Sequence, residues 1–246
     1  MISLYLWDDP RAARFAPYAL TRPAGELRAG AVLTRERWER AFDTHAIGFV
    51  AAAHLTDFEE PGAPRAAMTV PAGAVLVNAR CLPSLGGFVD TRATRWSCGG
   101  RTAAVLLSTE MTAAELDALE SLDDVPTEGG TGEVLGRWLE GPWDLVGSLA
   151  AQLADDIHAL VGAIETDGTP AGATVIGRDA VVVERGAVVE PMVVLDASAG
   201  PILIRRGATI SSFTRLVGPC YVGEGSTVLG GRVAVASIGE RCKVAG

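Results

Sequence analysis

The chain has 246 residues, of which 48% are hydrophobic and 21% charged, enough to bury the core of one large domain or two modest ones. This composition excludes an intrinsically disordered chain, and the net charge of −9 argues against binding to nucleic acid or to an anionic membrane surface. No apolar run reaches the roughly 18–20 residues that span a bilayer, and residues 1–9 lack the features of a signal peptide. We therefore expect a cytoplasmic protein.

Short strands and helices alternate in the first part of the chain. Residues 2–7 are predicted as a strand that ends at Asp8-Asp9-Pro10, because proline has no amide to donate to a β-ladder. Residues 33–42 predict a surface helix with Thr34 as its N-cap. Apolar runs that are typical of parallel strands buried on both faces follow at 46–53, 74–77 and 102–107.

Two further helices are predicted before residue 168. Thr112 and Glu115 form a capping box, in which each side chain bonds a free amide of the first turn, so a helix begins there and runs to about residue 122. Pro142 opens a long amphipathic helix over 143–164. Together with the strands, these helices predict an α/β domain at residues 1–168.

The chain changes character after residue 168, where apolar residues recur every six positions. This spacing is typical of a parallel β-helix of hexapeptide repeats, in which each repeated apolar side chain points into the interior. A β-sandwich is the alternative, but its strands would recur every 8–12 residues. The inward positions are predicted to be Ile176, Val182, Val188, Val194, Ile204, Ile210, Leu216, Val222 and Val228.

The second domain is therefore predicted at 169–246, with about four coils. Because solenoids need capped ends and the repeat pattern still runs at Gly246, we expect either a longer natural chain or a partner subunit that covers the last coil.

Cysteine and tryptophan residues are predicted to be structural. The four cysteines have no C-x2-C spacing and no neighbouring histidine, so we expect buried free thiols rather than a zinc site. Trp38 and Trp143 occupy apolar helix positions and are predicted to lie in the core.

Three stretches of the chain carry a recognisable pattern: residues 18–39, Val77-Asn78-Ala79-Arg80 and Pro142-Trp143-Asp144-Leu145. In the first stretch, the residues of the pattern are Leu20, Thr21, Arg22, Pro23, Glu26, Leu27, Arg28, Gly30, Leu33, Thr34, Arg35, Glu36, Trp38 and Glu39. This pattern resembles a divergent set of bacterial sugar-1-phosphate nucleotidyltransferase-like proteins, relatives of the bifunctional N-acetylglucosamine-1-phosphate uridyltransferase. The resemblance implies a compact Rossmann-like nucleotidyltransferase domain followed by a left-handed β-helix that forms a homotrimer.

The resemblance also implies a reaction, in which a nucleoside triphosphate and a sugar 1-phosphate give a nucleotide sugar and pyrophosphate with the help of Mg²⁺. UTP and N-acetylglucosamine 1-phosphate are the substrates expected by analogy, in the synthesis of cell-envelope precursors. Arg22 and Arg28 would bind phosphate, and Asp8 or Asp9 would hold the magnesium ion. Nucleotide or sugar contacts are assigned to Thr21, Glu26, Asn78 and Arg80.

Some of these polar residues also have a structural interpretation. Glu26 is favoured as an ion-pair partner of Arg22 or Arg28 rather than as a sugar ligand. The helix arginines are favoured as a solvated face that pairs with Glu36 and Glu39; they are Arg35, Arg37 and Arg40.

Three departures from the pattern of the established sugar-1-phosphate nucleotidyltransferases fall on the expected site. Asp8-Asp9-Pro10 replaces a glycine-rich phosphate loop, Ala24 stands where the family has a lysine, and Asn78-Ala79-Arg80 lacks the metal-binding aspartate. A non-catalytic subunit that binds a sugar nucleotide or serves in assembly is therefore the alternative. A third hypothesis is a hexapeptide acyltransferase, but all three histidines precede the repeats, so its base would lie in coils beyond residue 246.

Overall fold

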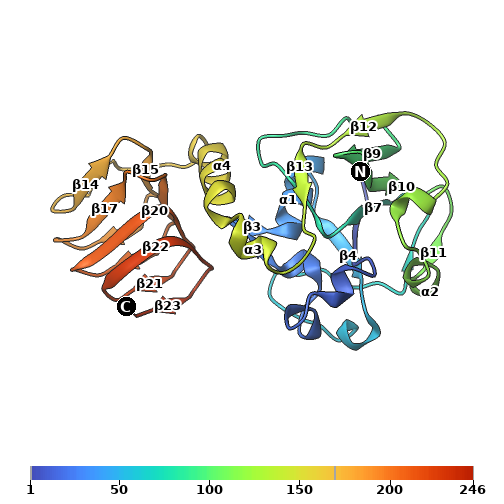
Figure 1. Ribbon diagram of the computed structural model, residues 1–246, viewed down its shortest axis with the longest axis horizontal. Helices are drawn as coiled ribbons and strands as arrows, with labels where there is room; N and C mark the ends of the chain where they lie inside the picture. The colour runs from blue at the N-terminus through green and yellow to red at the C-terminus, as the bar shows by residue number, and fades with distance from the viewer. Residues whose placement is uncertain (1, 169, 246) are drawn as a thin grey trace. The chain divides into compact units, whose positions relative to one another are not determined.

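The computed structural model describes residues 2–168 and 170–245 (Figure 1). The chain divides into two compact units, Met1–Val146 and Gly147–Gly246. The division lies before the long helix α4 (Leu149–Val161), whereas the sequence places it at residue 168. Helix α4 belongs to the second unit because it packs on strands of the β-helix.

The first unit is built around a seven-stranded mixed sheet (Figure 1). Strand β1 pairs in parallel with β4 on one side and with β7 on the other, and β4 pairs in parallel with β5. Strand β10 runs antiparallel to both β7 and β9. In order across the sheet, the strands are β12 (Thr131–Glu133), β9 (Arg95–Cys98), β10 (Arg101–Leu106), β7 (Val75–Asn78), β1 (Leu4–Trp7), β4 (Ala46–Val50) and β5 (Arg65–Ala66).

The order of these strands creates a topological switch point. The chain passes from β1 to β4 and β5 on one side, then returns to β7 on the other side of β1. Crossover connections leave a crevice where they diverge, at the carboxyl ends of β1 and β7, and open α/β sheets bind ligands in that crevice.

Both faces of this sheet are covered, as the apolar strands predict. Leu4 and Leu6 enter a core with Trp38 of helix α1 (Thr34–Phe42), while Trp7 enters a second core with Leu116 of helix α2 (Ala113–Asp117). Short strands complete the unit: β2 (Arg28–Ala29), β3 (Val32–Leu33), β6 (Thr69–Val70), β8 (Cys81–Pro83), β11 (Met111–Thr112) and β13 (Gly136–Trp138). The 3₁₀ turns are η1 (Ala12–Arg14), η2 (Tyr18–Leu20), η3 (Ala24–Glu26), η4 (Ala53–Leu55) and η5 (Leu122–Asp124).

The predicted helices are present, but two are shorter than expected. The capping box of Thr112 and Glu115 is confirmed, yet α2 ends at Asp117 instead of residue 122. The helix predicted over 143–164 is divided into α3 (Asp144–Gly147) and α4, with Ser148 between them. The prediction that Trp143 lies in the core is wrong, because it precedes α3 and is 68% exposed. Among the described residues, no helix has the length and apolar character of a membrane span.

The second unit is a parallel β-helix whose coils stack in register. One side is formed by β14 (Thr174–Gly177), β17 (Val194–Ala197) and the first halves of β20 (Thr214–Val222) and β22 (Gly231–Ile238). A second side is formed by β15 (Val181–Val183), β18 (Ile202–Ile204) and the second halves of β20 and β22. The third side is formed by β16 (Val188–Val189), β19 (Thr209–Ile210), β21 (Thr227–Val228) and β23 (Lys243–Val244).

The six-residue period is confirmed, but its predicted phase is wrong by one residue before the insertion near 200. Val183 and Leu195 are buried in the core, whereas the predicted Val182 and Val194 are only half-buried, and Val188 is 53% exposed. A slip of one residue turns every side chain of a strand to the other face. After the insertion the predicted positions are right, and all five are fully buried: Ile204, Ile210, Leu216, Val222 and Val228.

Helix α4 covers part of the outer surface of the β-helix, against β18, β20 and β22. Leu203 lies between two inward-facing residues of β18 and therefore points outward, yet it is fully buried. Leu153 and Ile157 of α4 are also fully buried. Among the described cysteines, Cys81, Cys98 and Cys220 are buried free thiols as predicted, and Cys242 is exposed.

Substitutions on adjacent residues of β17 test the phase of the repeat. Leu195→Ala should lower the free energy of unfolding by about 2–5 kcal/mol, because it empties a fully buried position. Val194→Ala should cost less than about 1 kcal/mol, because that side chain lies outside the core. Denaturant unfolding of the two variants measures the difference, and a larger cost for Val194 would support the phase predicted from the sequence.

Candidate functional site

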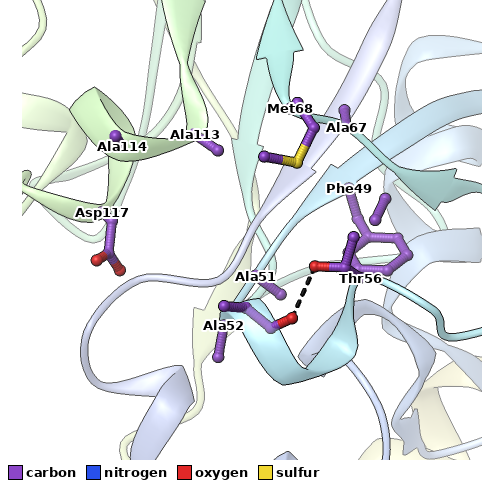
Figure 2. A pocket seen from close by; sticks show the side chains of 11 residues that line it. Phe49, Ala51, Ala52, Thr56, Ala67, Met68, Ala113, Ala114 and Asp117 are labelled. Carbon is purple, nitrogen blue, oxygen red and sulfur yellow. Dashed lines mark hydrogen bonds between the residues drawn. The ribbon is translucent and has the colours of Figure 1, made fainter.

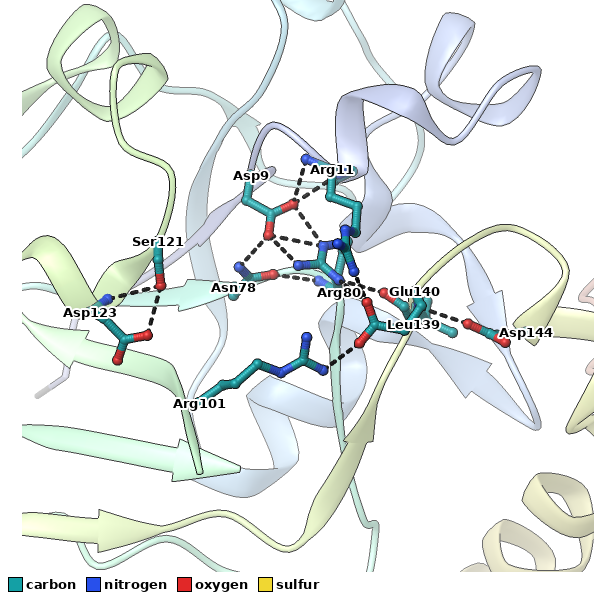
Figure 3. Close-up of polar contacts among 11 residues, drawn as sticks. Asp9, Arg11, Asn78, Arg80, Arg101, Ser121, Asp123, Leu139, Glu140 and Asp144 are labelled. Atoms are coloured by element: carbon teal, nitrogen blue, oxygen red, sulfur yellow. Dashed lines mark hydrogen bonds and ion pairs between the residues drawn. The ribbon is translucent and has the colours of Figure 1, made fainter. Parts of the chain in front are cut away.

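A mostly polar cavity of about 280 Å³ lies at the switch point, beyond the carboxyl ends of β1 and β7 (Figure 3). We call it the arginine cavity, because four arginines line it together with two carboxylates. Its lining residues are Asp9, Pro10, Arg11, Arg14, Asn78, Arg80, Arg101, Thr102, Glu120, Ser121 and Trp138.

The floor of the arginine cavity is a buried ion pair between Asp9 and Arg80. Arg80 donates from Nε to Asp9 Oδ1 at 2.7 Å and from Nη2 to Asp9 Oδ2 at 2.5 Å. Asn78 donates to Asp9 Oδ2 at 2.9 Å, and the amides of Arg11 and Ala12 donate to Oδ1. Burial opposes ionisation of Asp9, but the hydrogen bonds from Arg80 and Asn78 hold its pKa below the ordinary value. Asp9 is therefore a fixed carboxylate.

Glu140 does not line the cavity, but its carboxylate contacts three of the arginines that do (Figure 3). It forms an ion pair with Arg11, accepts a hydrogen bond from Arg101 Nη2 at 2.5 Å, and lies 3.8 Å from Arg80 Nη1. The hydrogen bond from Arg101 lowers the pKa of Glu140. The Arg101 guanidinium also stacks 4.3 Å from the centre of the Trp138 ring, which fixes its plane.

Asp9 and Glu140 differ in solvent exposure, and therefore in the free energy that their ion pairs contribute. The Asp9 side chain is 5% exposed, and removal of one partner from such a buried pair costs about 3–5 kcal/mol. The Glu140 side chain is 42% exposed, and solvent-exposed pairs contribute only about 0.2–1 kcal/mol each. The Asp9 pair therefore belongs to the framework of the site, whereas the Glu140 pairs are weak enough to exchange.

Asp8 points away from this cluster, as adjacent residues at a strand end do. Its carboxylate accepts hydrogen bonds from the Ala24 amide at 2.9 and 3.2 Å. Burial and the neighbouring charge of Asp9 raise the pKa of Asp8 to about 7, although the bond from Ala24 opposes that change.

The two aspartates do not form a shared magnesium site in this arrangement. Asp8 and Asp9 face separate partners, and within the described part of the chain no three His, Cys, Asp or Glu side chains meet where they could hold a metal. The assignment of magnesium to either carboxylate stays a prediction.

Five of the eight predicted site residues do not line the arginine cavity: Asp8, Thr21, Arg22, Glu26 and Arg28. Arg22 pairs with Glu60 at 2.8 Å, and Thr21 donates to the Tyr18 carbonyl. Arg28 donates to the Ala31 carbonyl at 2.6 Å. Thr21 and Arg28 are thus bonded within their own segments and Arg22 to a separate loop, so the geometry gives no support to their phosphate and nucleotide assignments.

The predicted partner of Glu26 is also wrong. Glu26 is buried and accepts a hydrogen bond from Arg35 Nε at 2.6 Å, rather than pairing with Arg22 or Arg28. Arg35 and Arg37 are therefore not a solvated helix face, since both are buried. Arg35 lies between Glu26 and Glu39, whose charges raise its pKa despite its burial.

Asp9, Asn78 and Arg80 are the predicted residues that the structure brings together. Sequence reasoning missed Arg11, Arg14, Arg101 and Glu140. Arg11 and Arg14 follow the predicted end of the first strand, which is a signal that could have identified them. Arg101 had no such signal, because it begins a strand instead of following one.

A second cavity, of about 190 Å³, opens beside the carboxyl ends of β4 and β5 (Figure 2). Most of the residues that line it are alanines. The Thr56 hydroxyl donates a hydrogen bond to the Ala53 carbonyl at 2.7 Å. We call it the alanine cavity; it is lined by Phe49, Ala51, Ala52, Ala53, Thr56, Ala66, Ala67, Met68, Ala113, Ala114 and Asp117. Because β4 is the parallel neighbour of β1, both cavities lie along the same edge of the sheet.

Removal of the fixed carboxylate should destabilise the first unit. Asp9→Asn leaves the buried Arg80 without its counter-ion and should lower the free energy of unfolding by about 3–5 kcal/mol. Arg92→Ala breaks an exposed pair with Asp90 and should have little effect on stability. Denaturant unfolding compares them, and similar midpoints for the two variants would contradict the framework role of Asp9.

The raised pKa of Asp8 predicts a pH dependence of stability. The folded state holds a proton on Asp8 up to about pH 7, whereas the unfolded state releases it near pH 4, so the protein loses stability as the pH rises between these values. Asp8→Asn should remove this loss and stabilise the protein at pH 8 by about 1–2 kcal/mol, after allowance for partial solvation. Thermal unfolding at pH 5 and pH 8 measures it, and an equal effect at both values would refute the explanation.

Most of the chain matches a known protein family. The sequence model of the sugar nucleotidyl transferase family matches residues 4–163, which include every residue that lines the arginine cavity. A comparison with curated proteins gave no match. Because the family match covers well over half of the chain, this protein belongs to the sugar nucleotidyl transferase family.

Proposed function

We propose that the protein transfers a nucleotidyl group from a nucleoside triphosphate to a sugar 1-phosphate in the arginine cavity. The observation that carries this proposal is the meeting of four arginines at the switch point of a family member. In the reaction, a phosphate oxygen of the sugar forms a bond to the α-phosphorus, and the bond from that phosphorus to pyrophosphate breaks. The sequence resemblance supports UTP and N-acetylglucosamine 1-phosphate as the first pair to test.

Guanidinium groups suit this chemistry because phosphoryl transfer depends on positioning and charge neutralisation rather than on covalent help from the protein. Arg101 is oriented by stacking on Trp138, and Arg80 by its two-point contact with Asp9. Both groups can therefore meet a phosphate without losing much side-chain freedom on binding. Arg11 and Arg14 extend the positive lining toward the loop after β1.

The alanine cavity provides a place for the nucleoside. A nucleotide with its phosphates in the arginine cavity has to extend along the edge of the sheet, and β4 is the strand next to β1. Small apolar side chains such as Ala51, Ala66 and Ala67 leave room for a flat ring. We assign the base to this cavity and the sugar phosphate to the β7 side, near Asn78.

An assay of pyrophosphate release tests the proposed reaction. The purified full chain is incubated with Mg²⁺, the usual counter-ion of nucleoside triphosphates, and a grid of triphosphates and hexose 1-phosphates. Arg101→Ala should lower kcat/KM by about 100-fold or more, because it removes a donor from the developing charge. Arg92→Ala is the matched control and should leave kcat/KM unchanged.

Two outcomes would contradict this assignment. Loss of activity in Arg28→Ala with full activity in Arg101→Ala would move the phosphate site to the loop that contains Thr21 and Arg28. Tight binding of a sugar nucleotide without turnover of any substrate pair would favour the non-catalytic alternative.

A further inference from the structure

Three guanidinium groups from separate parts of the first unit converge on the single carboxylate of Glu140 (Figure 3). Arg11 comes from the loop after β1, Arg80 follows β7, and Arg101 begins β10. Each guanidinium carries five N–H donors, whereas a carboxylate offers two oxygens and one negative charge. Arg80 is already paired with Asp9, but Arg11 and Arg101 alone have more donors and more charge than Glu140 can match.

A phosphate group fits this arrangement better than a carboxylate does. It offers three free oxygens and up to two negative charges, and paired N–H donors of arginine match its geometry. Asp9 already neutralises Arg80, so Arg11, Arg14 and Arg101 provide the remaining positive charge of the cavity. Their charge suits the several negative charges of pyrophosphate.

Glu140 is also placed so that its side chain can leave without disturbing the framework. Its amide donates to Asp144 Oδ2 at 2.7 Å, and both the amide and the carbonyl of the preceding Leu139 are bonded to Arg80. The backbone is therefore held, while the side chain is 42% exposed. Rotation about the side-chain bonds of Glu140 is enough to move its carboxylate into solvent.

We propose that Glu140 occupies the position of a substrate phosphate in the ligand-free protein, and that phosphate or pyrophosphate displaces it from Arg11 and Arg101. This inference rests on the proposed function, because the displacing anion is part of the substrates and the product of that reaction. Glu140 then acts as an internal competitor that weakens the binding of pyrophosphate and speeds its release.

Titration calorimetry with inorganic pyrophosphate tests the competition directly. Glu140→Gln keeps the size of the side chain but removes its charge, so it should bind pyrophosphate about tenfold more tightly than the wild type. Arg101→Ala should weaken binding in both backgrounds. Thermal unfolding of each variant confirms that it is folded.

Glu120→Gln is the matched control, because it removes the same charge from a residue that lines the arginine cavity but does not pair with its arginines. Glu120 forms no ion pair found among the described residues, so its substitution should change the affinity for pyrophosphate by less than about threefold. If both variants gained the same affinity for pyrophosphate, the loss of any negative charge near the cavity would explain the gain, and the proposal would be overturned. Unchanged or weaker binding by Glu140→Gln, or no binding by any of the proteins, would also overturn it.

The same measurements separate this inference from the proposed reaction. Tighter binding by Glu140→Gln, together with no turnover of any substrate pair, would reject the reaction but retain the anion site. Turnover by the wild type without tighter binding by Glu140→Gln would reject only the competitor role.

Discussion

The buried ion pair between Asp9 and Arg80 is the interaction on which the candidate site depends. It joins the segment after β1 to the segment after β7, the two strand ends that border the switch point. Arg80 also donates to the Leu139 carbonyl and accepts from the Leu139 amide through its own carbonyl, so the same residue anchors the segment that carries Glu140. Buried pairs of this kind add little net stability, but they fix geometry strongly. Through Arg80, the ends of β1 and β7 and the segment that carries Glu140 are therefore held together.

The local charge of the arginine cavity is opposite to that of the whole chain. The protein has a net charge of −9, yet the cavity gathers four arginines against Asp9 and Glu120. A concave positive region in an acidic protein attracts small anions while the rest of the surface repels extended polyanions. This distribution suits nucleotides and sugar phosphates, the ligands of the reaction we propose.

Sequence patterns predicted the elements of this fold better than the details that depend on neighbours. The six-residue period identified the β-helix, but Val181-Val182-Val183 has no polar residue to mark which side faces inward, so the phase was wrong there. Glu26 was paired with arginines close in sequence, whereas its partner Arg35 reaches it from α1. The phase of the repeat and the partner of Glu26 both depend on which elements pack together, and the local sequence does not show this packing.

The same limit applies to the candidate site. The family resemblance, whose landmarks include two strand ends, identified Asp9, Asn78 and Arg80. It could not identify Arg101, which lies at the start of its strand. Only the antiparallel pairing of β10 with β7 brings that start to the carboxyl end of β7.

After β1 this chain has Asp8-Asp9-Pro10 where the established nucleotidyltransferases have a glycine-rich phosphate loop, and the hydrogen bonds of this segment differ accordingly. Where that loop offers backbone amides to phosphate, the amides of Arg11 and Ala12 are bonded to Asp9 and are no longer available. In the reaction we propose, anion binding therefore passes from the backbone to arginine side chains. Backbone amides carry no net charge and need no counter-ion, but converging guanidinium groups repel one another. Glu140 offsets that repulsion in the ligand-free protein, which explains why a displaceable carboxylate accompanies an arginine-lined site.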